Sequence, residues 1–408
     1  MRAAKIAAIA LVALFPTLGH AEETGLGPTS GEKLLDEAVT TTRKNWWDRA
    51  NRDKIDWQGL VERYREQVKH AATPLEAHHV VNALLGELHT SHLALMEGAV
   101  YDRELAPEFA SKPTVRGALE LELLDQAYFV GSVLEGSPAE KAGLRVGDEV
   151  LAIDGKKTAE SPLLQEAGHD PGLTLPPGYV LDVKKSETLT FTVRHTKGGE
   201  PMTVSFEPRS LSMVDAAKAS VRVVELEGKR LGVVHLWHFM SSDMNGVLRA
   251  AIKGPLADCD GLVLDVRGRG GRANVIWEVE GNFTGKNPTW KKPVVVLQDH
   301  GTRSAKEIFA WAWKKKKNLG KIVGERTLGA VIGCNFKKLF DGSVLMYPAQ
   351  DVRPMTNGEP LEGHGVEPDV SVDPGDLQFR NGRDAILDQG EKVLLEEIRE
   401  ARSRARWL

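Results

Sequence analysis

The stretch from Pro293 to Lys315 constrains the fold of this chain more than any other. It opens with four apolar, β-prone residues, Val294 to Leu297, which indicate a buried parallel strand. A polar turn follows, and an amphipathic helical pattern begins around Ser304. The order of strand, turn and helix predicts an α/β unit with Ser304 in the first turn of its helix.

Ser304 admits two interpretations. Serine is a preferred N-cap residue, so this side chain could serve the helix alone. A hydroxyl at this position also lies beside unpaired backbone N–H groups and the positive end of the helix dipole. An acyl-transfer enzyme places its nucleophile there, because the same N–H groups can receive the oxyanion. This stretch by itself favours the cap, and only the rest of the chain can change that balance.

Further strand-and-helix units surround this stretch. Apolar strands are predicted at Leu231–Leu236, at Gly261–Val266 and around Ile322, with a helix over Asp243–Lys253. Such alternation predicts a mostly parallel sheet with crossover helices. The chain has 408 residues, of which 41% are hydrophobic and 27% charged, as in an ordinary globular protein of two or three domains.

Two segments of different character precede the α/β part. Residues from about 30 to 96 carry apolar side chains at helical spacing, with a helix start at Thr73-Pro74. This pattern breaks at the polar run His89-Thr90-Ser91-His92. From Thr114 onward, short alternating strands with turns replace the helical pattern, which indicates a separate β-rich domain.

The sequence GSPAEKAGLRVGDEVLAIDG, from Gly136 to Gly155, resembles the most specific stretch of PDZ domains. The resemblance implies that Gly117, Ala118 and Leu119 form the loop that binds a peptide's terminal carboxylate, beside a strand that pairs with the peptide. The module could instead be a spacer. A Pro- and Gly-rich insert from Ser161 to Gly178 is atypical of the family and leaves open whether the groove is accessible.

Two motifs follow the PDZ-like segment, D-V-R-G-R-G-G at Asp265–Gly271 and E-G-H-G-V-E-P-D at Glu362–Asp369. Together with the helical segment and the serine-bearing helix, in this order, they resemble the tricorn and C-terminal-processing serine peptidases over nearly the whole mature chain. The resemblance implies an α/β fold, with a crotonase-like α/β protease core, an N-terminal helical segment and an inserted PDZ domain.

The two branches of that superfamily use different catalytic bases. The C-terminal-processing branch takes a lysine directly after a V-G-E-x-T-x-G stretch. Here that stretch ends at Gly329 and the next residue is Ala330. Because a methyl group cannot accept a proton, a serine–lysine dyad through this position is excluded.

The tricorn branch instead uses a Ser-His-Ser-Glu tetrad. Resemblance to its motifs assigns Ser91 and His92 in the T-S-H run, Ser304 as the nucleophile, and Glu362. The chemistry fits these roles, because a serine hydroxyl needs a base and an imidazole with an ordinary pKa of about 6.5 can provide one. Glu362, acting through Ser91, would orient the imidazole and support its positive charge.

Backbone N–H groups are the candidates for the oxyanion hole, namely those of Ala305 and of Gly270 or Gly271. Glycine lets the main chain approach a substrate without a Cβ clash, although a glycine pair could also form only a tight turn. His89 is the rival candidate for the base, and Glu359 is the nearest substitute for the carboxylate.

The first 21 residues are typical of a secretory signal. A positively charged start, with Arg2 and Lys5, precedes an apolar core from Ile6 to Phe15 and the small-residue cleavage site Gly19-His20-Ala21. The apolar core is too short to span a membrane, and no later segment approaches the roughly 20 residues required. These features predict a periplasmic or secreted protein.

Features that the sequence lacks argue against several classes of partner and cofactor. A net charge of −4 without a basic stripe argues against nucleic acid as a partner. The histidines show no metal-ligand spacing, so neither a metal nor a cofactor is expected. Cys259 and Cys334 are the only cysteines, and they could pair in an oxidising compartment or stay free thiols.

The sequence therefore predicts an exported serine endopeptidase that acts on polypeptides through Ser304 activated by His92, with a PDZ domain that assists binding of substrate C-termini. No membrane span is expected, and a homo-oligomer is compatible with the sequence. A catalytically inactive PDZ-containing peptide-binding scaffold is the alternative, and thioester chemistry on a crotonase-like core is a second. The predicted parts are a signal peptide (1–21), an N-terminal helical segment (22–113), a PDZ domain (114–208) and an α/β tricorn-type serine protease core (209–400).

Overall fold

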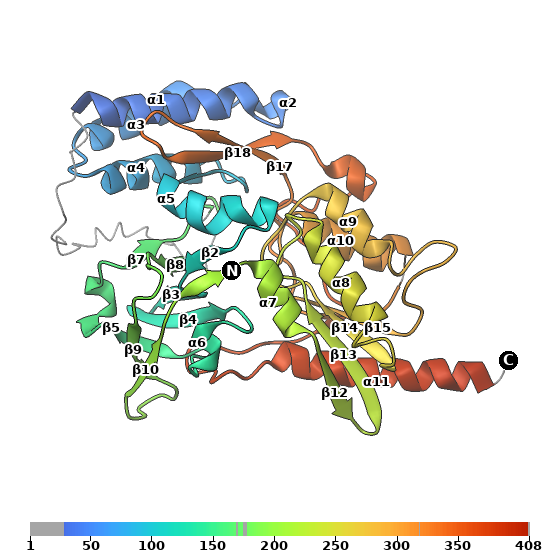
Figure 1. The fold of residues 1–408 in the computed structure, drawn as a ribbon. Coiled ribbons are helices and arrows are strands. Elements are labelled where there is room, and N and C mark those ends of the chain that lie inside the picture. Colours follow the sequence, from blue (N-terminus) through green and yellow to red (C-terminus); the bar gives the residue numbers. More distant parts are fainter. Residues whose placement is uncertain (1–27, 169, 174–177, 318, 407–408) are drawn as a thin grey trace, which may run out of the picture.

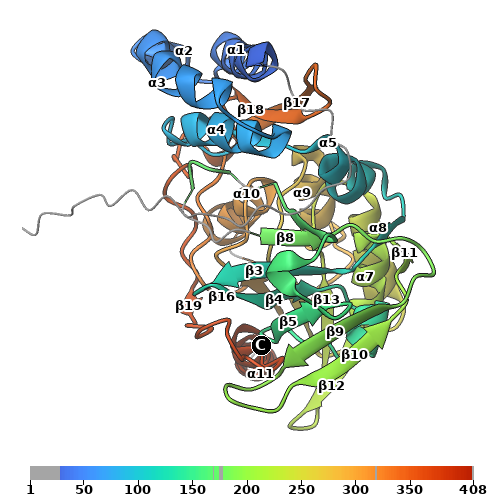
Figure 2. The ribbon, with the colours of Figure 1, turned by 90° about the vertical axis from the view of Figure 1, so that its left-hand side faces the viewer.

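The structure is a computed structural model that describes residues 28–168, 170–173, 178–317 and 319–406. The predicted signal peptide, residues 1–21, lies outside the described residues. Figures 1 and 2 show the helical segment at one end of the molecule, above the PDZ-like module and the α/β core. Among the described residues, no helix combines the length and apolar character that a membrane span requires.

The α/β core is built on a six-stranded sheet, counted over the described residues. The first strand of this sheet runs antiparallel to its neighbour and the other five run parallel, which confirms the predicted α/β fold. The central strands are buried along their whole length, as their continuous apolar runs predict. In spatial order the strands are β12 (Arg222–Leu226), β13 (Lys229–His235), β14 (Gly261–Asp265), β15 (Val294–Gln298), β16 (Ile322–Gly324) and β19 (Val370–Ser371).

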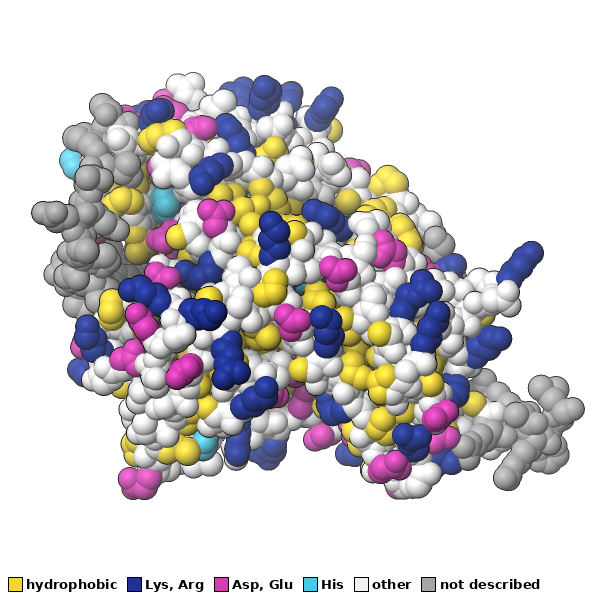
Figure 3. All heavy atoms as spheres, viewed as in Figure 1, with side chains coloured by type: hydrophobic (Ala, Val, Ile, Leu, Met, Phe, Trp, Pro, Cys, Tyr) yellow, Lys and Arg dark blue, Asp and Glu magenta, His cyan; other side chains and the backbone are white. Residues whose placement is uncertain are grey.

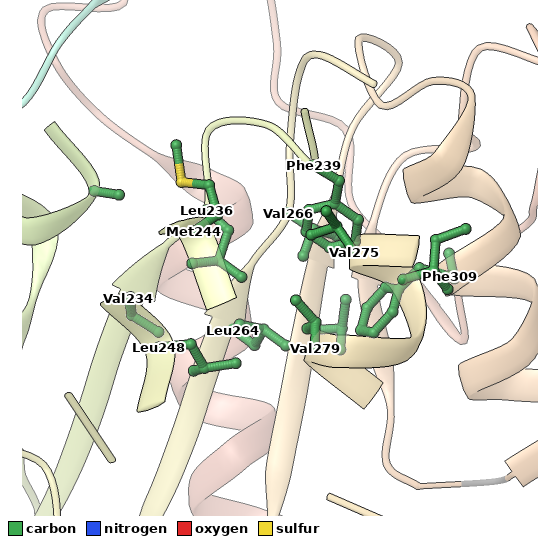
Figure 4. Packing of buried hydrophobic residues seen from close by; sticks show 14 of the residues in the cluster. Val234, Leu236, Phe239, Met244, Leu248, Leu264, Val266, Val275, Val279 and Phe309 are labelled. Atoms are coloured by element: carbon green, nitrogen blue, oxygen red, sulfur yellow. The ribbon is translucent and has the colours of Figure 1, made fainter. Parts of the chain in front are cut away.

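Helices cover both faces of this sheet. On one face, Leu264 and Val266 pack against Leu248, Val279 and Phe309 in the largest hydrophobic cluster (Figure 4). On the other face lies one long helix, which runs along the bottom of Figure 1. The first face is covered by α7 (Met213–Ser220), α8 (Asp243–Lys253), α9 (Ala273–Glu280) and α10 (Ala305–Trp311), which continues into η4 (Ala312–Lys317); the second is covered by α11 (Ala385–Arg406).

The N-terminal helical segment packs around its own core, in which Leu34, Leu35, Leu84 and Leu85 are almost fully buried. The observed start of its last long helix matches the sequence, since Thr73 accepts a hydrogen bond from the N–H of Glu76. The helices are α1 (Pro28–Asn45), α2 (Arg49–Arg52), α3 (Trp57–Lys69), α4 (Pro74–Gly86) and α5 (Gly98–Val100), followed by η1 (Tyr101–Leu105) and η2 (Ala106–Ala110).

A three-stranded antiparallel sheet joins the helical segment to the C-terminal part of the chain. The expected helical pattern therefore ends before Ala94, because Ala94 to Met96 form an edge strand there. Leu345 from the C-terminal part lies fully buried in the core of the helical segment. The strands, in spatial order, are β1 (Ala94–Met96), β18 (Val344–Gln350) and β17 (Gly333–Lys338), and η5 (Arg353–Thr356) follows them in sequence.

The PDZ-like module is a separate antiparallel sheet with its own hydrophobic core around Leu121, Val130 and Phe191. A short two-stranded ribbon links it to the rest of the chain. In spatial order the strands of the sheet are β10 (Met202–Phe206), β9 (Leu189–Arg194), β5 (Glu149–Ile153), β4 (Ala127–Val133), β3 (Leu119–Leu124), β8 (Gly178–Leu181) and β7 (Leu164–Glu166), and β6 (Lys156–Lys157) pairs with β5. The module also contains the helices α6 (Pro138–Lys141) and η3 (Thr158–Glu160). The ribbon consists of β2 (Thr114–Arg116) and β11 (Arg209–Leu211).

The surface carries charges of both signs. On the face shown in Figure 3, Lys and Arg side chains alternate with Asp and Glu side chains and with small hydrophobic areas. This distribution agrees with the mixed charge pattern of the sequence.

Candidate active site

Ser304 lies directly before the first residue of α10, at the end of the turn that follows β15. Its backbone has φ 58° and ψ −124°, a conformation that residues with a side chain rarely adopt. The N–H of Ser304 donates to the carbonyl of Ala330 and to the carboxylate of Glu307, both at 2.9 Å. These bonds hold a strained backbone in place, and strain of this kind is common at active sites.

Glu307 anchors the turn around the nucleophile. Its carboxylate also accepts bonds from the hydroxyl of Thr327 and from the N–H groups of Gly329 and Ala330, at 2.6 to 2.9 Å. Burial raises the pKa of Glu307 to about 7, although all these donors favour the charged form. Glu307 was not among the residues predicted from the sequence, although the Ser-x-x-Glu spacing of a capping box points to it.

Ala330 occupies the place where the C-terminal-processing branch carries its lysine. It is fully buried and its carbonyl contacts the nucleophile's N–H, so a base on this side chain would lie beside Ser304. The next residue, Val331, donates its N–H to Glu362 at 2.6 Å. This dipeptide therefore joins the nucleophile to the other half of the site.

The other half is a relay of hydrogen bonds from Glu362 through Ser91 to His92. The Ser91 hydroxyl donates to Oε2 of Glu362 at 2.9 Å and lies 2.8 Å from Nδ1 of His92. The N–H of Ser91 donates to the other carboxylate oxygen, also at 2.9 Å. Because the hydroxyl proton goes to the carboxylate, Nδ1 of His92 must carry the proton that reaches Ser91. Nε2 is then left unprotonated and free to act as a base.

The imidazole of His92 is buried. Burial and the nearby guanidinium of Arg303 together lower its pKa to about 3, against the opposing effect of the Asp170 carboxylate. Burial raises the pKa of Glu362, while its bonds from Ser91 and Val331 favour the ionised form. Within the described part of the chain, Nε2 makes no hydrogen bond, and such bonds often form only when substrate is bound.

The two alternative residues lie elsewhere. His89 is exposed, and it takes no part in the relay. Glu359 accepts a hydrogen bond from the indole N–H of Trp311 at 2.7 Å, and Lys315 lies 3.8 Å from its other oxygen. The structure thus brings together Ser91, His92 and Glu362 and leaves both alternatives outside that group.

The candidate oxyanion groups lie on two sides of Ser304. A Cβ on Gly270 would lie 2.7 Å from Cβ of Ser304, so only glycine fits against the nucleophile. Gly271 lies instead against Phe239, where a Cβ would come within 2.2 Å of the backbone. Among the described residues, the N–H groups of Gly270, Gly271 and Ala305 have no hydrogen-bond acceptor, which is what an oxyanion hole requires.

Lys306, two residues after the nucleophile, is a second residue that we missed in the sequence. Its ammonium donates to the carbonyls of Trp237 and Arg267, both at 2.9 Å, and so ties α10 to the start of the glycine turn. Burial lowers the pKa of Lys306 to about 7. No sequence motif predicts a buried lysine at this position.

Asp170 and Arg303 form an ion pair at the edge of the site. Asp170 is fully buried and belongs to the insert between β7 and β8, whereas Arg303 directly precedes Ser304. Burial acts to raise the pKa of Asp170, but Arg303 and His92 hold it below its ordinary value. From the sequence, the insert was expected only to affect access to the PDZ groove, so this contact with the candidate site was not predicted.

Gly117 and Ala118 precede β3 and Leu119 is its first residue, where a PDZ domain would receive its peptide. The chain's own β8 already pairs with that edge, with Tyr179 opposite Leu121. Leu181 lies against the loop, since a Cβ on Gly117 would be 3.2 Å from its Cδ1. A peptide can therefore add to this edge only after β8 has moved.

Neither a metal site nor a disulfide is found among the described residues. No group of His, Cys, Asp and Glu within them could hold a metal ion. Cys259 and Cys334 are both free thiols, and burial raises the pKa of Cys334 to about 12.

A strained serine and a buried histidine relay on a parallel α/β sheet are features of serine peptidases. Comparison with known proteins finds segments of this chain that are similar to such enzymes. Residues 278–372 match peptidase family S41, residues 129–166 match a PDZ domain, and residues 30–86 match the tricorn protease C1 domain. The predicted relationship to the tricorn and C-terminal-processing peptidases is thereby confirmed.

Individual relatives agree with these matches. The putative tricorn protease homolog 2 of Streptomyces coelicolor is 29% identical over 89% of this chain and 32% of its own length. The crystal structure of the tricorn protease superposes with a TM-score of 0.54 at 21% identity, over 91% of this chain and 37% of that one. The photosystem II D1 C-terminal processing protease gives 0.50 at 22% identity, over 88% and 98%. The chain spans 32% to 44% of the length of the first curated relatives it matches.

Proposed function

We propose that this chain hydrolyses peptide bonds, with Ser304 as the nucleophile and His92 as the general base. The observation that carries the proposal is the relay from Glu362 through Ser91 to Nδ1 of His92. The relay orients the imidazole with Nε2 unprotonated and gives the charge that forms on it a carboxylate partner. A serine that only caps a helix does not require such a relay.

Each step uses groups of this chain. Nε2 of His92 takes the proton of Ser304 Oγ as that oxygen attacks the carbonyl carbon of the scissile bond. The N–H groups of Ala305 and of Gly270 or Gly271 receive the oxyanion of the tetrahedral intermediate. The imidazolium then gives its proton to the amine, the C–N bond breaks, and an acyl-enzyme on Ser304 remains. In the second half of the reaction, water gives a proton to His92 and attacks the acyl carbonyl. The acid product is released as His92 returns that proton to Ser304.

Substrate C-termini are proposed to bind at the PDZ-like module. The loop Gly117 to Leu119 borders a small cavity that is also lined by Arg116 and Arg269, two cations that a carboxylate could meet. Both are paired with carboxylates of the chain, Glu108 and Glu120. A substrate tail would therefore compete with these partners and with β8.

Export is a separate proposal. Its support is the sequence of residues 1–21, with a charged start, an apolar core and small residues at the cleavage site. Determining the N-terminus of the protein recovered from the periplasm or medium tests it. A mature chain beginning near Glu22 supports export, and an intact N-terminus in the cytoplasm contradicts it.

The inactive scaffold remains the alternative, and a hydrolysis assay separates the two. Fluorescently labelled denatured casein is the probe, with the wild-type protein beside Ser304→Ala. Release of fluorescent peptides by the wild type but not by the variant supports the peptidase. No release by either protein, together with peptide binding by both, supports the scaffold.

A further inference from the structure

The insert of the PDZ-like module reaches into the protease site. Its residue Asp170 is fully buried and pairs with Arg303, which directly precedes the nucleophile. Gly172 of the same insert lies against the backbone of Thr90, where a Cβ would be 2.8 Å from the carbonyl oxygen. The insert is therefore seated on the T-S-H run that carries the catalytic base.

Asp170 has acceptor capacity left at this position. One oxygen bonds the guanidinium of Arg303, and the other, Oδ1, is buried and has no hydrogen-bond partner among the described residues. An unpartnered carboxylate oxygen in the interior is costly unless a positive charge lies near it. Arg303 is one such charge, and the imidazolium that forms on His92 during the reaction is a second.

Few charges surround His92. The Arg303 guanidinium opposes a positive imidazole, and the Asp170 carboxylate supports it. Glu362 acts on the ring only through the hydroxyl of Ser91. Cys334 lies near Arg303 and Asp170, but its thiol, with a pKa of about 12, stays neutral. Without Asp170, the unpaired Arg303 next to Ser304 would destabilise the protonated imidazole of His92.

We propose that Asp170 is a positioning residue for the catalytic base, which cancels the charge of Arg303 and supports the imidazolium that forms on His92. The PDZ-like module would then supply part of the protease site. This inference rests on the proposed function. Its rival is a purely structural ion pair that only fastens the insert.

The test measures the rate of inactivation by a fluorophosphonate across pH, because that reaction needs the nucleophile and base but no known substrate. Asp170→Asn keeps the shape of the side chain, and it should lower the plateau rate about tenfold. Arg303→Met should shift the acid limb of the profile upward by about one pH unit, because a lone Asp170 favours the imidazolium. The double variant should recover most of the rate lost in Asp170→Asn.

Glu149→Gln is the matched control, since Glu149 pairs with Arg194 within the same module. Its profile should equal that of the wild type. The inference would be overturned by equal plateau rates in Asp170→Asn and wild type. It would also be overturned if both single variants reacted more slowly but the acid limb did not move. If the wild type is not labelled at Ser304 at all, the proposed function fails instead, and the two failures are thereby distinguished.

Discussion

Two residues of the candidate site, His92 and Ser304, have unusual backbones, and so has His89 outside the relay. His89, His92 and Ser304 have φ values of 46°, 58° and 58°, in the left-handed region that residues with a Cβ avoid. Each such residue costs on the order of 1–3 kcal/mol, and neighbouring contacts must hold it there. At Ser304 these contacts are the bonds to Ala330 and Glu307.

His92→Ala should lower turnover by several orders of magnitude, about as much as Ser304→Ala. The double variant should lose no more than either single one, because nucleophile and base act as a unit. Hydrolysis of labelled casein by the three variants provides the measurement. His89→Ala is the control and should stay near wild type, because its side chain lies outside the relay. Loss of turnover in His89→Ala with an active His92→Ala would move the base to His89.

Glu362→Gln should fold normally yet lose most of its turnover, since a neutral amide no longer supports the imidazolium. The loss should be smaller than in Ser304→Ala, because orientation is one part of the catalytic effect. Glu359→Gln is the matched control, with its side chain at Trp311 instead of Ser91. Steady-state kinetics of both variants, with thermal melts to verify folding, decide between the two carboxylates.

The buried His92 should also make the fold sensitive to acid. Its pKa is about 3 in the folded chain and about 6.5 in the unfolded one. Between these values the unfolded chain binds the proton and the folded chain does not, so stability falls as the pH drops through this window. His92→Gln should flatten that part of the profile of Tm against pH. An identical slope in wild type and variant would show that His92 does not contribute.

The sequence proposes the tetrad residues because each lies in a short local motif, and the structure brings three of them, Ser91, His92 and Glu362, into one hydrogen-bonded relay. Lys306 lies close to Ser304 in the sequence, yet only the burial seen in the structure distinguishes it from an ordinary helix residue, whereas the capping-box spacing points to Glu307. Asp170 could not be predicted, because it meets Arg303 across 133 positions of sequence and the insert that carries it has no motif.

At the scale of elements, the insert forms strand pairings that the hydrophobic pattern of the sequence does not predict. The alternating strands of the PDZ-like module and the parallel strands of the core follow from apolar patterns, and both are present. The stretch from Ser161 to Gly178 looked irregular, yet it contributes β7 and leads directly into β8, which pairs with the edge of β3. Pairing of this kind depends on a long-range partner, so a local pattern does not reveal it.

Tail recognition is therefore tested best with paired peptides. If the loop Gly117 to Leu119 binds a free carboxylate, an amidated peptide should be processed with a raised KM and an unchanged kcat. Measuring both constants for acid and amide forms of one peptide provides the comparison. Because β8 occupies the edge of β3, the acid form must displace it. Equal KM and kcat values for the acid and amide forms would show that the PDZ-like module does not recognise the substrate's terminal carboxylate.

At the scale of the whole molecule, the site is assembled from every part of the chain. The proposed base His92 comes from the end of the helical segment, Asp170 from the PDZ-like module, the proposed nucleophile Ser304 from the α/β core and Glu362 from a later loop. The sheet of β1, β18 and β17 ties the first and last of these parts together. The proposed mechanism therefore requires the complete chain to be folded.

The most direct measurement is therefore the site of covalent labelling by a fluorophosphonate on the full chain at neutral pH. The account predicts one adduct, located on Ser304 by peptide mapping, that is absent from Ser304→Ala and forms far more slowly in His92→Ala. Labelling that persists in Ser304→Ala, or a folded wild-type protein that takes up no probe, would contradict it.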